Sequence, residues 1–155
     1  MITGFDAYLF IAILLALALT KEPKKIAVLA CVFVLGSIMA LNVYIEPGWS
    51  FYYAATLIEI TASFAMILGA RVQVKRANRM YFRAMGAFFA LSVLVTFGLI
   101  MDVLAFSSYL SMSHAVGFSH VTFMLGFSDG VGNGIQNLRD YLSRGNNHSV
   151  GVRHD

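Results

Sequence analysis

The stretch IAVLACVFVLGSIMALNVYI, residues 26–45, has no charged side chain and determines the class of this protein. An α-helix rises about 1.5 Å per residue, so about 20 apolar residues cross the hydrocarbon core of a bilayer. The whole chain has the same character, because 59% of its residues are hydrophobic and only 12% are charged. Soluble domains have roughly 25% charged residues. The apolar runs lack the alternation of barrel strands, so the sequence predicts an all-α, polytopic helical membrane bundle.

Four apolar runs are predicted to span the membrane, at about 5–20, 26–45, 51–70 and 84–105. The first run could also be interpreted as a secretory signal peptide, because Ala16-Leu17-Ala18 matches a small-x-small cleavage site. A signal peptide has Lys or Arg before its apolar region, but no Lys or Arg precedes this run. We therefore expect a retained helix.

A fifth span at 109–127 is the open question of the topology, since this segment is uncharged but contains several Ser and His residues. The alternative is a helix that lies at the interface or over the bundle. Lys and Arg gather at the cytoplasmic ends of spans. The loops 21–25 and 71–83 hold three and five basic residues, and the turn 46–50 holds none. This distribution places both basic loops in the cytoplasm and the N-terminus outside. A fifth span would put all 11 basic residues on one side, which favours five spans over four.

The chain divides at about residue 128, with the bundle at 1–128 and a polar C-terminal part at 129–155. In the second part Ile135, Leu138 and Leu142 recur at helical spacing, which predicts a short amphipathic helix followed by a flexible tail. Three glycines are predicted to form a flexible joint before this helix: Gly130, Gly132 and Gly134.

Glu59 is the strongest candidate for a functional residue, because it lies well inside the third predicted span. A carboxylate at this depth costs a few kcal/mol on insertion scales and usually faces the interior of the bundle. By helical rise, Ser37 and Thr96 lie at a similar depth, so the three residues form a candidate ion or proton site. The alternative is a protonated or hydrogen-bonded glutamate that fixes helix packing or oligomer contacts.

Small residues on the predicted spans are candidates for close helix packing, since they let two backbones approach. They are Ala12, Ala16, Gly36, Ala40, Ala55, Ala62 and Ser63. Basic residues of the segment 71–83 are expected to contact anionic lipid headgroups rather than nucleic acid. They are Arg71, Lys75, Arg76, Arg79 and Arg83.

Cofactor and metal chemistry are not expected from the sequence. His114 and His120 are six residues apart, which places them on different faces of a helix, whereas a metal pair is normally spaced by three or four. Cys31 is the single cysteine, which excludes an intrachain disulfide and dithiol redox chemistry. No nucleophile–base pattern is present, so we expect no enzymatic activity.

Two functional hypotheses follow from these features. The first is a non-enzymatic structural or assembly subunit of a membrane complex, together with other subunits or copies of itself. This class includes virion membrane proteins of a phage or virus, holin-like lysis proteins and accessory subunits of cellular complexes. The second is a small carrier coupled to protons or cations, in which Glu59 binds the transported ion.

Overall fold

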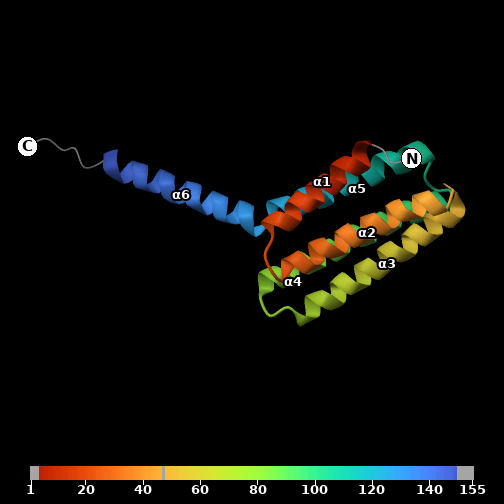
Figure 1. Ribbon diagram of the computed structural model, residues 1–155, viewed down its shortest axis with the longest axis horizontal. Coiled ribbons are helices and arrows are strands. Elements are labelled where there is room, and N and C mark those ends of the chain that lie inside the picture. The colour runs from red at the N-terminus through yellow and green to blue at the C-terminus, as the bar shows by residue number, and fades with distance from the viewer. Residues whose placement is uncertain (1–3, 47, 150–155) are drawn as a thin grey trace, which may run out of the picture.

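The computed structural model describes residues 4–46 and 48–149, and it places the side chains of 8–46 and 48–139. Within these residues the chain forms six α-helices and no strand: α1 (Gly4–Leu19), α2 (Lys24–Tyr44), α3 (Trp49–Val72), α4 (Arg76–Ile100), α5 (Phe106–Gly126) and α6 (Asp129–Ser149). The first five lie side by side, and α6 projects away from them (Figure 1). The all-α class predicted from the sequence is confirmed.

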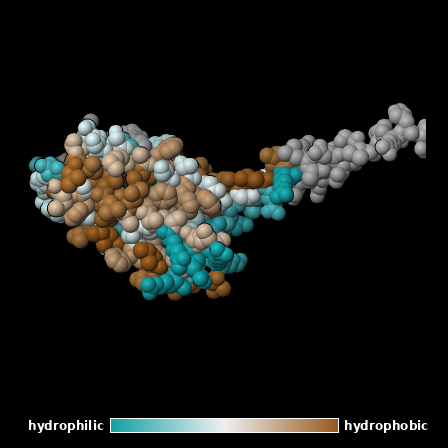
Figure 2. Space-filling model, turned by 180° about the vertical axis from the view of Figure 1, so that it is seen from behind, coloured by the Kyte–Doolittle hydropathy of each residue, from teal (hydrophilic) through white to brown (hydrophobic). Residues whose placement is uncertain are grey.

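Among the described residues, three helices are long and apolar enough to cross a membrane: α2, α3 and α4. The apolar part of α1, Tyr8–Leu19, is shorter, and α5 is not among the three although it has 21 residues. Phe33, Leu57 and Phe64 expose 74%, 65% and 64% of their surface, which suits contact with lipid. In Figure 2 hydrophobic residues cover much of the bundle, and a hydrophilic patch lies at the end formed by the α3–α4 turn.

The basic segment 71–83 is mostly helical, so its prediction as a loop is wrong. The helix α3 continues to Val72 and α4 begins at Arg76, before the predicted start of the span at residue 84. Arg79 stabilises the short connection, because its Nε and Nη2 donate hydrogen bonds to the backbone oxygen of Gln73 at 3.3 and 3.1 Å. Arg is a good helix former and can extend its charge toward water, so a helix can continue through these positions.

The prediction of a glycine joint before the C-terminal helix is also wrong. The helix α6 starts at Asp129 and includes all three glycines. Ser128 begins this helix as an N-cap, because its Oγ accepts a hydrogen bond from the backbone N–H of Val131 at 3.4 Å. The exposed side chains of Ile135 and Leu138 lie on α6. The predicted flexible tail begins at residue 146, but 146–149 still belong to α6, so the helix is longer than predicted. The rest of the tail, 150–155, and the side chain of Leu142 fall outside the described residues.

Contacts between helices close a ring in the order α1, α2, α3, α4, α5 and back to α1, with an additional contact between α2 and α4. Successive helices run in opposite directions, so α1 and α5 are parallel neighbours (Figure 1). One end of the ring, here named the basic end, contains the α1–α2 turn, the α3–α4 turn and the start of α6. The opposite end, named the far end, contains the α2–α3 and α4–α5 turns.

The closest packing in the bundle joins α3 to α4. The Ser63 Oγ on α3 donates a hydrogen bond to the backbone oxygen of Gly86 on α4 at 2.9 Å. A Cβ atom at Gly86 would lie 3.2 Å from the Cβ of Met66 and 3.3 Å from the Cγ1 of Ile67. Only glycine allows this approach without displacing its neighbours.

We expect Gly86→Leu to destabilise the bundle by about 1–3 kcal/mol, because the added side chain must push α3 and α4 apart. Gly126→Leu is the matched control, since a Cβ at that position meets no atom within 4 Å. Unfolding of the purified protein in mixed detergent micelles, followed by far-UV circular dichroism, measures both variants. Equal losses of stability would contradict the close α3–α4 contact.

Candidate functional site

A cavity of about 460 Å³ lies inside the helix bundle, and residues of all five helices α1–α5 line it. Many of the lining side chains are aliphatic or aromatic, but a set of polar side chains also reaches it. These are Asn42, Tyr52, Glu59, Ser92, Thr96, Tyr109, Ser113, His114 and His120. Polar groups gathered in the interior of an apolar bundle make this cavity the candidate functional site.

Glu59 is held in the wall of this cavity about 15 Å from the start of α3 by helical rise. The Oγ of Ser92 on α4 donates a hydrogen bond to Glu59 Oε1 at 2.6 Å. The second carboxyl oxygen, Oε2, is buried and has no hydrogen-bond partner among the described residues. An unsatisfied buried polar atom costs about 1–3 kcal/mol, so a ligand or proton that engages Oε2 would be favoured here.

The predicted trio of Glu59, Ser37 and Thr96 is only partly brought together. Thr96 is buried and lines the cavity with Glu59. Ser37 is half-buried and is not among the lining residues, whereas its neighbours Val34 and Ile38 are. Helical rise gives the depth of a residue along the helix but not the direction in which its side chain points. Ser37 was therefore included on depth alone. Ser92, the partner of Glu59, was missed, although it lies one turn before Thr96.

The two histidines of α5 both line the cavity, despite their spacing of six residues. His120 stacks on Phe88 with ring centroids 4.8 Å apart and meets the edge of Phe89 at 5.2 Å. Its Nε2 lies 3.3 Å from Met85 Sδ and 3.8 Å from Cys31 Sγ. Within the described residues, no three His, Cys, Asp or Glu side chains are grouped so that they could hold a metal ion.

The small residues predicted for helix packing fall into two groups. Ala12, Ala16, Ala55, Ala62 and Ser63 are buried inside the bundle. Gly36 and Ala40 are exposed on the outer surface of α2, one helical turn apart. The buried group is used within the chain, so of these small residues only Gly36 and Ala40 remain available to a second molecule.

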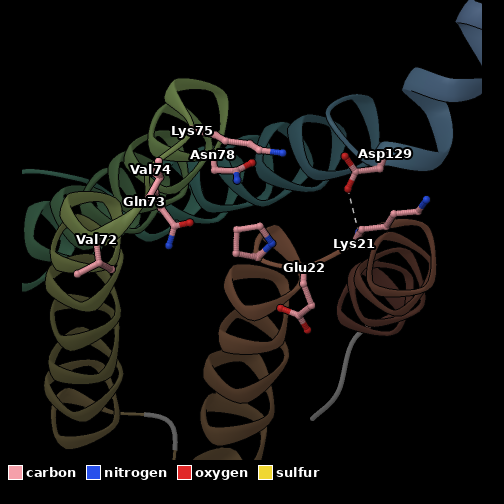
Figure 3. A pocket seen from close by; sticks show the side chains of 9 residues that line it. Lys21, Glu22, Val72, Gln73, Val74, Lys75, Asn78 and Asp129 are labelled. Carbon is pink, nitrogen blue, oxygen red and sulfur yellow. Dashed lines mark hydrogen bonds between the residues drawn. The ribbon is translucent and has the colours of Figure 1, made fainter.

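A second cavity, of about 490 Å³, lies at the basic end (Figure 3). Its lining comes from the α1–α2 turn, the α3–α4 turn and the start of α6: Lys21, Glu22, Pro23, Val72, Gln73, Val74, Lys75, Asn78 and Asp129. Arg71, Lys75, Arg76 and Arg83 are exposed, whereas Arg79 is half-buried and bonded to Gln73. The segment 71–83 thus offers four exposed cations for the predicted contact with anionic lipid, which stays a prediction.

Asp129 connects α6 to the α1–α2 turn. Its Oδ2 accepts a hydrogen bond from the backbone N–H of Lys21 at 2.9 Å, and its Oδ1 pairs with the Lys24 ammonium at 3.1 Å (Figure 3 shows the Lys21 contact). Desolvation opposes ionisation of Asp129, but the hydrogen bonds and charges of Lys21 and Lys24 outweigh it. The pKa of Asp129 is therefore lower than its ordinary value of 3.8.

We expect this connection to weaken in acid. A carboxyl group whose pKa falls on folding stabilises the folded form above its ordinary pKa, and this stabilisation is lost as the pH falls below about 4. Asp129→Asn should loosen the start of α6 already at neutral pH, with amide exchange up to about fivefold faster, because a partly exposed ion pair contributes about 1 kcal/mol. Hydrogen-exchange mass spectrometry measures this effect. Asp102→Asn, in the exposed α4–α5 turn, is the control, and an equal response of both variants would contradict the role of Asp129.

No family model matches this chain, and no curated protein and no solved structure is significantly similar to it. The side chains of the inner cavity therefore give the most direct indication of function.

Proposed function

We propose that this protein is a small membrane carrier that moves protons or cations through the inner cavity, with Glu59 as the binding group. The observation that supports this proposal is the unpartnered Oε2 of Glu59 in a cavity inside an apolar bundle. A carboxylate, a carboxamide and hydroxyl groups offer the oxygen ligands that replace water around a cation. Glu59, Asn42, Ser92 and Thr96 supply such groups.

The arrangement of the cavity supports a pathway that starts at the far end. Tyr52 and Tyr109 meet edge to face there, with ring centroids 5.7 Å apart, and both line the cavity. At the opposite side of the cavity, Met85 and Met124 are fully buried and close the way to the basic end. The two rings are in contact, so they must separate to admit an ion, which would then reach Glu59 before this closed region.

The same arrangement favours five spans. Leu9 and Ile13 of α1 line the cavity, as do many residues of α5. If the cavity lies at membrane depth, α1 and α5 lie there too. Four polar side chains of α5 then face the cavity, namely Tyr109, Ser113, His114 and His120. Other hydroxyl residues of α5 are exposed on the outside of the bundle, namely Ser107, Ser108, Ser111, Ser119 and Thr122. We infer that the N-terminus lies outside and the basic end lies in the cytoplasm, as the distribution of Lys and Arg requires.

We expect Glu59→Gln to reduce ion flux to background, because an amide binds neither a proton nor a cation as a carboxylate does. Glu46→Gln makes the same chemical change at an exposed position of the α2–α3 turn and should retain the flux of the unaltered protein. Proteoliposomes under gradients of protons, sodium or potassium measure the flux, with a pH-sensitive dye for protons and a sodium- or potassium-sensitive dye for the other two ions.

Ser92→Ala serves as an intermediate test, since it removes the hydrogen bond to Oε1 and keeps the carboxyl group. This variant should retain a reduced flux. Full flux in Glu59→Gln protein that inserts and folds normally, or no flux in the unaltered protein under any of the three gradients, would rule out the carrier.

A second candidate function, a non-enzymatic structural or assembly subunit, is favoured by one observation. Gly36 and Ala40 form an exposed small-residue surface in the apolar helix α2, and a Cβ at Gly36 would meet no atom within 4 Å. Such a surface lets a neighbouring helix approach closely in lipid. Its occupant would be another membrane protein or a second copy of this chain.

Gly36→Leu should disrupt that assembly, because the added side chain separates the two helices. Native electrophoresis and mass spectrometry after gentle extraction from membranes measure the size and composition of the complex. Gly126→Leu, which also enters open space, should leave the complex intact. A chain that remains monomeric in its native membrane would exclude this function.

A further inference from the structure

Two sulfur atoms and one nitrogen atom lie close together between Glu59 and the basic end. They belong to Cys31 on α2, Met85 on α4 and His120 on α5, so three different helices contribute one atom each. Cys31 is 3% exposed and Met85 is 0% exposed, and both Cys31 and His120 line the cavity. His120 Nε2 lies 3.8 Å from the thiol sulfur and 3.3 Å from the thioether sulfur.

These separations are close to those of ligands around one metal ion. First-row metal sites have bonds of about 2.3 Å to sulfur and about 2.0 Å to imidazole nitrogen, as zinc sites do. At trigonal angles such bonds hold sulfur and nitrogen about 3.7 Å apart. The two separations from His120 Nε2 bracket this value, so the imidazole nitrogen lies at a suitable distance from each sulfur atom to share an ion with it. The distances also permit a weak N–H···S contact without metal, and the experiment must separate the two cases.

We propose that Cys31, Met85 and His120 form a binding site for Cu(I). Thiolate and thioether sulfur are soft ligands that select Cu(I), and imidazole also suits copper. Metal-site patterns that use only His, Cys, Asp and Glu do not include a methionine ligand such as Met85.

Charge selects the monovalent ion over zinc. Binding converts the Cys31 thiol to a thiolate, the sulfur–copper bond replaces the sulfur–hydrogen bond, and the proton is released to water. One thiolate and one Cu(I) ion give a neutral unit, which is tolerated in an apolar interior. A divalent zinc ion would leave one uncompensated positive charge and would lack the fourth ligand that structural zinc sites have. The copper remains in the same oxidation state throughout, so no electron donor or acceptor is needed.

The aromatic neighbours of His120 support this site. Phe88 lies parallel to the imidazole with an interplanar angle of 13°, and Phe89 meets it at 89°. Packing on two sides fixes the direction of Nε2 toward both sulfur atoms, which is the orientation that a ligand requires. The two rings also limit the access of water to the site.

The Cu(I) site is separate from the Glu59–Ser92 pair and does not depend on the carrier function. The intact protein, purified anaerobically in detergent with ascorbate, is titrated with Cu(I) in competition with a chromophoric Cu(I) chelator. We expect one equivalent to bind, and X-ray absorption to show sulfur and nitrogen neighbours. Cys31→Ala should abolish binding, and Met85→Leu should weaken it at least about tenfold, as losses at metal sites do.

Two controls separate the metal site from general effects on the fold and from transport. Met66→Leu changes another buried methionine, 3% exposed, and should leave the Cu(I) affinity unchanged. Glu59→Gln should bind Cu(I) normally even if it abolishes ion flux. Failure of the unaltered protein to compete with the chelator, or equal affinity in well-folded Met85→Leu and Cys31→Ala variants, would overturn the proposal.

Discussion

Hydrocarbon offers no hydrogen-bond partner, and this constraint governs the whole structure. It requires the apolar runs to be helical, because a helix pairs its own backbone groups. It also explains the polar contacts inside the bundle, where Ser63 donates to the backbone of Gly86 and Ser92 donates to Glu59. Glu59 Oε2 is the conspicuous exception, together with the hydroxyl of Tyr81, among the described buried side chains. An exception at this depth has to be stabilised by the rest of the fold, which is why it indicates a function.

The two halves of the bundle have different chemical character. Toward the far end the cavity is lined by hydroxyl, phenol and carboxamide groups, which are hard oxygen ligands. Toward the basic end Cys31 and His120 line it, and Met85 lies next to His120. The thiol and the thioether are soft ligands, and imidazole also suits copper. The contact between α2 and α4 adds packing across the ring, and the α3–α4 pair supplies a close-packed wall. A single apolar bundle thereby holds two distinct kinds of polar environment.

The sequence was sufficient to predict the class of the fold and the inward direction of Glu59. Both depend on hydrophobicity and on the free-energy cost of burying a charge, which can be assigned to each residue without knowing its neighbours. It was insufficient for contacts between helices. Ser37 was included and Ser92 missed because helical rise gives depth without rotation. The loop at 71–83 was predicted from charge, although arginine favours helices, and Ser128 was overlooked as the cap that starts α6. Cys31 and His120 were judged separately, and only the fold brings them to Met85.

An odd number of helices in the ring has a mechanical consequence. Four of the five neighbouring pairs are joined by a short turn, whereas the parallel helices α1 and α5 meet only through side chains. No covalent connection crosses this edge of the ring, so its stability depends on side-chain contacts alone. At the basic end of this edge, Asp129 at the start of α6 binds the backbone N–H of Lys21 and the ammonium group of Lys24. Side-chain packing between α1 and α5, together with the contacts of Asp129, therefore holds the one edge of the ring that no turn closes.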